Sequence, residues 1–242
     1  IVPTYNEAKL IEKKLDNIYQ QDYPRNKLEV IIVDSASTDE TPEKVRRWAT
    51  RHPDLDLKLI TEAKRRGKAY ALNHALTHAI GEIIIITDAD ALWPSKTLTK
   101  ALKWFTDPMV GAISCLKKPV GSRVKWVEES YRQYYNILRV AESKAYATPI
   151  FHGELAAFRR SLLEVLGGFP TDIGADDSHT ATRIALMGYR AITLEDLWVE
   201  ELVPNEGYFW WRVRRAQHLI QHFARTLKKI RQAPKEFGKI LA

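Results

Sequence analysis

Four consecutive isoleucines at residues 83–86 constrain the fold of this chain more than any other stretch. Polar residues bound the run, which is typical of a strand buried on both faces at the centre of a parallel sheet. The strand leads into Asp88 and Asp90. Residues two apart in a strand point to the same side, so we expect both carboxylates at the carboxyl edge of the sheet, where open α/β sheets bind ligands.

The rest of the chain alternates between strand and helix patterns. In the first half, apolar runs near residues 1–2, 28–33, 55–61 and 83–86 are separated by segments of helical periodicity. This order predicts an α/β fold with a mostly parallel central sheet flanked by helices. In the second half we expect helices over residues 94–105, 125–146, 161–166 and 176–187, and strands over 110–116, 150–158 and 189–194. No linker interrupts residues 1–207, which we interpret as one domain.

The net charge of +7 is concentrated at the end of the sequence. Residues 208–242 contain nine Lys/Arg and one acidic residue, whereas the first 207 residues contain 28 basic and 29 acidic ones. Apolar residues recur there at helical spacing: Phe209, Val213, Ala216, Ile220, Phe223, Leu227 and Ile230. We therefore predict a basic amphipathic helical tail over 208–242 that lies on an anionic membrane surface.

Other features restrict the compartment. The single cysteine, Cys115, excludes an intramolecular disulfide and suits a reducing compartment. No stretch approaches the roughly 20 apolar residues of a membrane span. The chain opens on Ile1 without a methionine, and we expect it to be the catalytic part of a longer membrane protein.

Charged residues at predicted strand ends and helix starts are the candidate site residues. Asp88 and Asp90 could hold Mg²⁺ together with phosphate oxygens, or could cap the next helix. Asp34 and Glu7 could bind a nucleoside, or serve as turn residues. Four basic residues surround Gly67 at a predicted helix start: Lys64, Arg65, Arg66 and Lys68. A helix N-terminus with added cations can bind a diphosphate, although basic residues in a loop can also be plain solvated surface.

The second half offers a general base and an acceptor site. Asp176 and Asp177 follow a glycine-rich loop, where one carboxylate could take a proton from an acceptor hydroxyl, or the pair could cap a helix. His152, Gly153 and Glu154 could reach the acceptor.

Taken together, the motifs resemble those of the family 2 inverting nucleotide-sugar glycosyltransferases, which have the GT-A fold. The resemblance covers roughly residues 1–205 and rests on five segments: 2–7 (VPTYNE), 34–41 (DSASTDET), 66–73 (RGKAYALN), 88–90 (DAD) and 174–177 (GADD).

The resemblance implies a role for each motif. Nucleotide-sugar binding falls to Pro3, Tyr5, Glu7, Asp34, Lys64, Arg66, Lys68, Asp88, Ala89 and Asp90. Asp90, with Asp88, would hold Mg²⁺ or Mn²⁺. Asp177 would be the catalytic base, with Asp176 beside it, and Arg212 and Arg214 would lie on the acceptor side with residues 152–154.

Departures from the family pattern narrow the activity. Processive members carry Gln-x-x-Arg-Trp after the base, whereas residues 211–215 here read WRVRR. We therefore expect transfer of a single sugar. The basic amphipathic tail predicts that the reaction occurs at the cytoplasmic face of the cell membrane, on a lipid-linked or polyprenyl-phosphate acceptor. The resemblance to one subfamily favours GDP-mannose over UDP-sugars as the donor. One alternative is a soluble transferase that extends a polysaccharide or glycoprotein. The other is a nucleic-acid-binding module that uses the basic tail, although we expect no nucleic-acid partner because the acids of the body would repel a polyanion.

Overall fold

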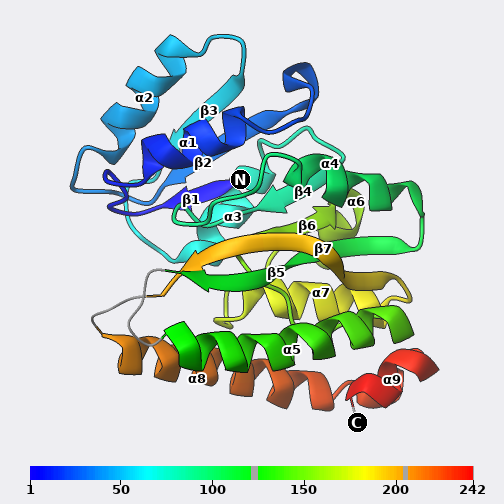
Figure 1. The fold of residues 1–242 in the computed structure, drawn as a ribbon. Helices are drawn as coiled ribbons and strands as arrows, with labels where there is room; N and C mark the ends of the chain where they lie inside the picture. Colours follow the sequence, from blue (N-terminus) through cyan, green and yellow to red (C-terminus); the bar gives the residue numbers. More distant parts are fainter. Residues whose placement is uncertain (121–124, 204–206, 242) are drawn as a thin grey trace.

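The computed structural model describes residues 1–120, 125–203 and 207–241 of the 242-residue chain. Two groups of strands occur in this part of the chain (Figure 1). The first is parallel, in the order β1 (Val2–Thr4), β2 (Glu29–Asp34), β3 (Asp56–Thr61). The second has the order β4 (Ile83–Ile86), β6 (Ala156–Arg159), β5 (Val110–Val120), β7 (Arg190–Leu202).

The two groups meet at Ile1. Its amino group donates a hydrogen bond to the Ile85 carbonyl (2.7 Å), and its carbonyl accepts one from the Thr87 amide (3.1 Å). This is the pattern of a parallel pair, so the sheet is continuous in the order β3-β2-β1-β4-β6-β5-β7. The other neighbour of β4 is antiparallel β6. The isoleucine strand therefore has parallel pairing on one side only, and the predicted α/β fold with a mostly parallel central sheet is confirmed.

Burial of the isoleucine run on both faces is confirmed. Ile84 (3% exposed) and Ile86 (0%) belong to one core cluster, while Ile83 and Ile85 pack against the other. One face is covered by α1 (Ile11–Tyr19), α2 (Thr41–Arg51) and α4 (Thr97–Leu102). The opposite face is covered by α3 (Lys68–Leu76), α6 (Arg160–Leu166), α7 (Asp176–Leu186) and α9 (Lys235–Leu241).

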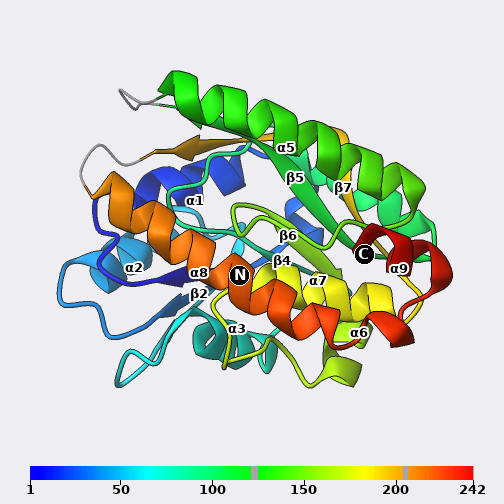
Figure 2. The same ribbon diagram turned by 90° about the horizontal axis from the view of Figure 1, so that it is seen from below.

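Two long helices lie side by side along the β5–β7 side of the molecule (Figures 1 and 2). These are α5 (Lys125–Ala145), which packs on β5 and β7, and α8 (Tyr208–Leu227), which contacts α7. Short 3₁₀ turns occur at η1 (Arg25–Lys27), η2 (Lys103–Thr106) and η3 (Ile230–Gln232). The predicted helix over 94–105 is thus divided into α4 and η2.

Strand β7 runs well past the predicted end at residue 194. A register shift between Ser114 and Leu116 of β5 lets the ladder resume at Leu116 and Trp198 and continue to Val120 and Leu202. A bulge absorbs the acidic residues at 195–196, which interrupt the apolar pattern in the sequence. The extension carries β5 and β7 beyond the carboxyl edge of the sheet, next to the candidate site.

Candidate active site

The nucleoside half of the site lies where β1 and β2 end. Asp34 is 2% exposed, and its carboxylate accepts hydrogen bonds from the Ser37 hydroxyl (2.6 Å) and amide (3.0 Å). The Tyr5 ring lies beneath the Arg65 guanidinium, 4.1 Å from the ring centroid. Ala36, in the same loop, has a φ of 58°, a strained value for a residue with a side chain. The two hydrogen bonds from Ser37 fix the loop that follows Asp34.

The basic segment surrounds the start of α3. Gly67 has a φ of 112°, which L-residues rarely adopt, and α3 begins at Lys68 with no side-chain cap, so the amides of its first turn have no partner within the helix. Lys64 and Arg66 are exposed, and Arg66 contacts Glu62 at 3.3 Å. The arrangement can receive an anion at the helix N-terminus.

Lys68 connects this helix to the loop that carries Asp88 and Asp90. Its Nζ lies 2.6 Å from Asp88 Oδ1. Burial disfavours the ammonium, but the carboxylates of Asp88, Asp176 and Asp177 outweigh it and hold the pKa of Lys68 above its ordinary range. Lys68 therefore stays protonated.

Three carboxylates crowd the carboxyl end of β4. Burial, then the charges of Asp90 and Asp88, raise the pKa of Glu7 to about 7. Burial and Asp88 raise the pKa of Asp90 in the same direction. Crowded carboxylates form a set of hard oxygen donors that suits Mg²⁺ or Mn²⁺. Within the described ranges no group of three or more His, Cys, Asp or Glu side chains is arranged as a complete metal site, so phosphate oxygens or water would have to supply the remaining ligands.

Gly153 lies at the point where these groups meet the candidate base. A Cβ on Gly153 would be 2.7 Å from Lys68 Nζ, 3.2 Å from Asp88 Oδ2 and 3.4 Å from Asp177 Oδ2. Residues from α3, β4 and α7 thus converge on one glycine, although 109 positions separate Lys68 from Asp177. Antiparallel β6 explains the convergence, because β6 starts beside Ile86 and so places the preceding loop at the carboxyl edge of β4.

The two acids at the start of α7 differ in their surroundings. Asp177 is half-buried, and its Oδ1 accepts a hydrogen bond from the Ser178 amide (2.7 Å), which leaves Oδ2 facing Gly153. Asp176 is 6% exposed. Burial raises its pKa to about 7; the cation of Lys68 opposes this shift, and the charge of Asp177 adds to it. Among the described atoms, Asp176 Oδ2 has no hydrogen-bond partner. Asp177 is the better placed of the two to accept a proton.

The acceptor-side candidates divide into two groups. Gly153 is part of the convergence, and the His152 amide beside it donates to the Ser114 hydroxyl (2.9 Å). Burial, and then the cation of Lys117, hold the pKa of His152 well below its ordinary value. The Glu154 carboxylate contacts Lys117, whose Nζ also lies 3.0 Å from Glu201, so Glu154 belongs to a buried ion cluster.

Helix α8 carries the two predicted arginines and also brings His218 next to the loop before Asp177. Arg212 stacks over Tyr131 at 5.0 Å, and Arg214 is exposed. The His218 ring packs directly on Gly174, where a Cβ would lie 2.2 Å from it. Burial, and then the charge of Arg214, lower the pKa of His218, and the charge of Asp177 opposes them.

Sequence reasoning missed three buried charged residues near the site. Glu62 directly follows β3, as Asp34 ends β2, and accepts a hydrogen bond from the Ser35 hydroxyl (2.9 Å). The strand-end rule could have found Glu62. Nothing in the local pattern distinguishes Lys14 or Lys117, because burial of a lysine depends on partners that are distant in sequence.

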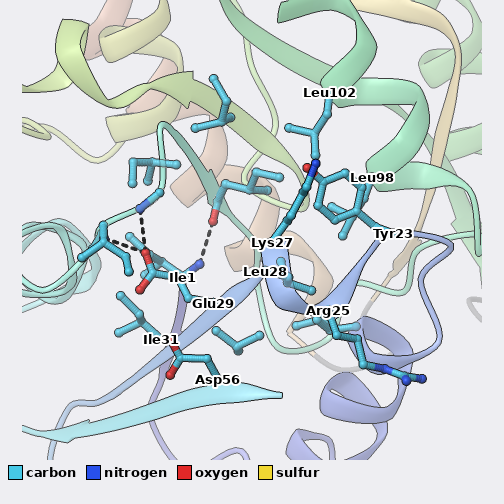
Figure 3. Close-up of a pocket in the computed structure, with 18 of the residues that line it drawn as sticks. Ile1, Tyr23, Arg25, Lys27, Leu28, Glu29, Ile31, Asp56, Leu98 and Leu102 are labelled. Carbon is cyan, nitrogen blue, oxygen red and sulfur yellow. Dashed lines mark hydrogen bonds between the residues drawn. The ribbon is translucent and has the colours of Figure 1, made fainter. Parts of the chain in front are cut away.

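A separate cavity of about 700 Å³ opens at the opposite, amino edge of the sheet. It lies around Ile1, Leu28 and Leu98, and its wall includes Glu29, whose carboxylate accepts bonds from the Ile80 and Gly81 amides (Figure 3). Because Asp88 and Asp177 lie at the carboxyl edge, this cavity is not part of the candidate active site.

Comparison with known proteins identifies the family. The family model described as glycosyl transferase family 2 matches residues 1–167, more than half of the chain. The chain belongs to glycosyl transferase family 2. The GT-A fold expected for this chain is confirmed by its similarity to a solved structure, the mannosyltransferase PcManGT from Pyrobaculum calidifontis in complex with GDP-Man and Mn²⁺. It is 66% identical and superposes with a TM-score of 0.90 over 99% of this chain and 66% of that one.

Curated relatives of this family 2 chain are longer than it is. A dolichyl N-acetyl-α-D-glucosaminyl phosphate 3-β-D-2,3-diacetamido-2,3-dideoxy-β-D-glucuronosyltransferase from Methanococcus voltae is 37% identical over 100 residues, 41% of this chain and 30% of the relative. A β-monoglucosyldiacylglycerol synthase from Synechocystis sp. is 28% identical over 220 residues, 88% of this chain and 45% of the relative. The chain thus spans half the length of these relatives or less. No described helix is long and apolar enough to cross a bilayer.

Proposed function

We propose that this chain is the catalytic part of a metal-dependent, inverting hexosyltransferase that moves one sugar from GDP-mannose to a lipid-linked or polyprenyl-phosphate acceptor at a membrane surface. The observation that carries the proposal is the convergence of Lys68, Asp88 and Asp177 on Gly153. It places the groups expected to bind a diphosphate next to a carboxylate that can act as the base. Residues 1–207 would form the catalytic unit and 208–242 the membrane-proximal part, in which α8 would meet the lipid while α9 packs against the core of the catalytic unit.

The donor assignment rests on the similarity to PcManGT, which was solved with GDP-Man. In this chain, Asp34 and Tyr5 would contact the nucleoside, with Pro3 and Glu7 beside them. Lys68 and the amides at the start of α3 would bind the diphosphate.

The same solved relative supports a divalent cation, because it holds Mn²⁺. Asp90 and Asp88 fit this ion, since their oxygens are hard donors in a region where burial, and then neighbouring carboxylates, raise the pKa values of Glu7 and Asp90. When bound, the ion would neutralise charge on the departing diphosphate.

Asp177 would carry out the proton transfer. Its Oδ2 would accept the proton of the acceptor hydroxyl while the acceptor oxygen bonds to the anomeric carbon, and the bond from that carbon to the diphosphate oxygen would break with its electron pair on GDP. Attack from the side opposite the leaving group inverts the anomeric configuration. The Ser178 amide bonded to Oδ1 would hold the carboxylate in orientation.

The exposed surface of α8 supports the proposal that the enzyme acts at a membrane. The helix packs on the body through polar residues such as His222 (0% exposed) and Thr226 (1%). Its apolar stripe instead faces solvent: Phe209 is 67% exposed, Ile220 68% and Leu227 52%. Neighbouring α5 also carries exposed apolar side chains, those of Trp126, Tyr134 and Ile137. Exposed cations nearby on the chain, Arg214, Lys228, Lys229 and Arg231, would attract anionic lipid.

Two relatives are consistent with a lipid acceptor, since their names include a dolichyl phosphate and a diacylglycerol. We place the reaction at the cytoplasmic face of the membrane, because basic segments such as residues 208–242 occur mainly on that side.

A transfer assay tests the proposal. Radiolabelled GDP-mannose, Mn²⁺ and a polyprenyl phosphate in anionic vesicles should give labelled lipid, and the NMR coupling constant of the product should report inversion. Absence of transfer and of donor hydrolysis with every sugar nucleotide would contradict it.

A further inference from the structure

A buried lysine lies behind the loop that carries Asp88 and Asp90. Lys14, on α1, is 0% exposed, although its neighbours on that helix face, Ile11 and Leu15, are apolar. Its Nζ donates to the Thr87 hydroxyl (2.7 Å) and to the Ala91 carbonyl (2.6 Å). One ammonium thus binds the residue just before Asp88 and the residue just after Asp90.

The same contacts reach the loop that carries Gly153. The Thr87 hydroxyl donates onward to the Glu154 carbonyl (2.8 Å), and the Trp93 indole N–H donates to that carbonyl as well (2.9 Å). Lys14 also lies 4.2 Å from the centroid of the Trp93 ring. Lys14 is therefore the centre of a network that joins the two loops on either side of the candidate site.

An ammonium at this place is costly for folding alone. Moving a cation from water to a core costs several kcal/mol unless its hydrogen bonds are replaced, and an apolar residue of similar size is often as stable. A methionine would continue the apolar face of α1 without that cost. A role in stability alone therefore explains Lys14 poorly, whereas holding both ends of a binding loop requires a donor at this point.

We propose that Lys14 is a positioning residue that fixes the Asp88-Ala89-Asp90 loop in the geometry that binds the metal and the diphosphate. The proposal rests on the proposed function, because it concerns the same site. Lys14 touches neither substrate nor metal in this account, and acts through Thr87 and Ala91.

Calorimetric titration of the chain with GDP, in Mn²⁺ and in EDTA, tests the role. Lys14→Met should weaken Mn²⁺-dependent GDP binding about 10–100-fold, the usual cost of losing a partner that orients a metal ligand, and leave metal-free GDP binding within about twofold. Lys100→Met is the matched control, because Lys100 also donates to a backbone carbonyl, that of Asp196 (2.9 Å), but lies on α4 with its side chain 40% exposed. It should bind like the wild type.

A second variant covers the case in which Lys14→Met does not fold. Thr87→Val preserves shape and removes the hydroxyl through which Lys14 acts, so it should weaken the Mn²⁺-dependent binding in the same direction. In a chain that already carries Asp90→Ala, Lys14→Met or Thr87→Val should cause little further loss of Mn²⁺-dependent GDP binding, because each of them acts through Asp90. Additive effects would show a role unconnected with the loop and would overturn the proposal.

The two proposals fail in different ways. Wild-type chain that binds GDP no better with Mn²⁺ than without it would contradict the proposed function and this inference together. Wild-type chain that shows the Mn²⁺ effect, with folded Lys14→Met or Thr87→Val binding equally well, would overturn the role of Lys14 alone.

Discussion

Lys68 Nζ lies 2.6 Å from Asp88 Oδ1, so the start of α3 and the end of β4 share one ion pair. The cation belongs to the helix start expected to bind a diphosphate, and the carboxylate belongs to the loop expected to bind a metal. Their contact means that the two predicted functions occupy one place. Gly153 lies against this pair, on the side that Asp177 faces.

Gly153→Ala should reduce kcat/KM for transfer by about 100-fold, because a displacement of about 1 Å at a reacting site has that effect. The new methyl would lie 2.7 Å from Lys68 Nζ, a flexible side chain that would move away from Asp88. Because the neighbours are side-chain atoms, the melting temperature should change by no more than about 4 °C. Gly238→Ala, whose methyl would have no neighbour nearer than 3.9 Å, should leave both quantities unchanged.

Asp90→Ala should weaken Mn²⁺-dependent GDP binding by more than the roughly 10–100-fold that follows loss of an outer-shell partner, because a direct ligand is lost. Calorimetry in Mn²⁺ and in EDTA measures the effect. Asp56→Ala, an exposed aspartate at the start of β3, is the control. Equal affinities for Asp90→Ala and wild type in Mn²⁺ would remove Asp90 from the metal site.

Ile220→Ser combined with Phe223→Ser should weaken binding to anionic vesicles on the order of 100-fold, since each side chain loses its apolar burial in the lipid. Vesicle flotation over a range of lipid concentrations measures the partition. Ile80→Ser removes an isoleucine that is 70% exposed at the amino edge of the sheet, and should bind like the wild type. If the double variant floats as well as the wild type, α8 is not the lipid-binding surface.

The attachment of α8 should weaken in acid. His222 packs edge-on against His179 of α7, with ring centroids 5.7 Å apart. Burial, and then the charge of His179, lower the pKa of His222 from 6.5 to about 4. The unfolded chain therefore binds more protons than the native one between these values, so stability is full above pH 6.5 and is lost as the pH falls toward 4.

His222→Gln should flatten this pH dependence. Melting temperatures measured by scanning fluorimetry at intervals from pH 7 to pH 4 should fall less for this variant than for the wild type. His78→Gln, which alters an exposed histidine on another surface, should keep the full decline. Parallel curves for His222→Gln and wild type would assign the acid sensitivity to other groups.

The sequence was most informative where a rule connects position along the chain to position in space. Strand ends of a parallel sheet share an edge, so Asp34 and Asp88 could be assigned to one site before the fold was known. The placement of Gly153 could not be predicted, because it depends on β6 running antiparallel to the isoleucine strand. Helical periodicity identified the stripe through Ile220, but its outward direction was predicted from the surplus of cations on the tail, since the spacing is the same whether a stripe faces the core or solvent. Lys14 was hidden for a related reason, because its partners are 73 and 77 residues away.

Transfer by Asp177→Asn tests the central claim most directly. Asparagine keeps the size of the side chain and cannot accept the acceptor proton, so calorimetry should find GDP and Mn²⁺ binding unchanged. Transfer from GDP-mannose to the hydroxyl group of a lipid-linked sugar should fall by about 10²–10⁴-fold, the usual contribution of a general base. Transfer at the wild-type rate by this variant would show that Asp177 is not the base and would contradict the account of the site.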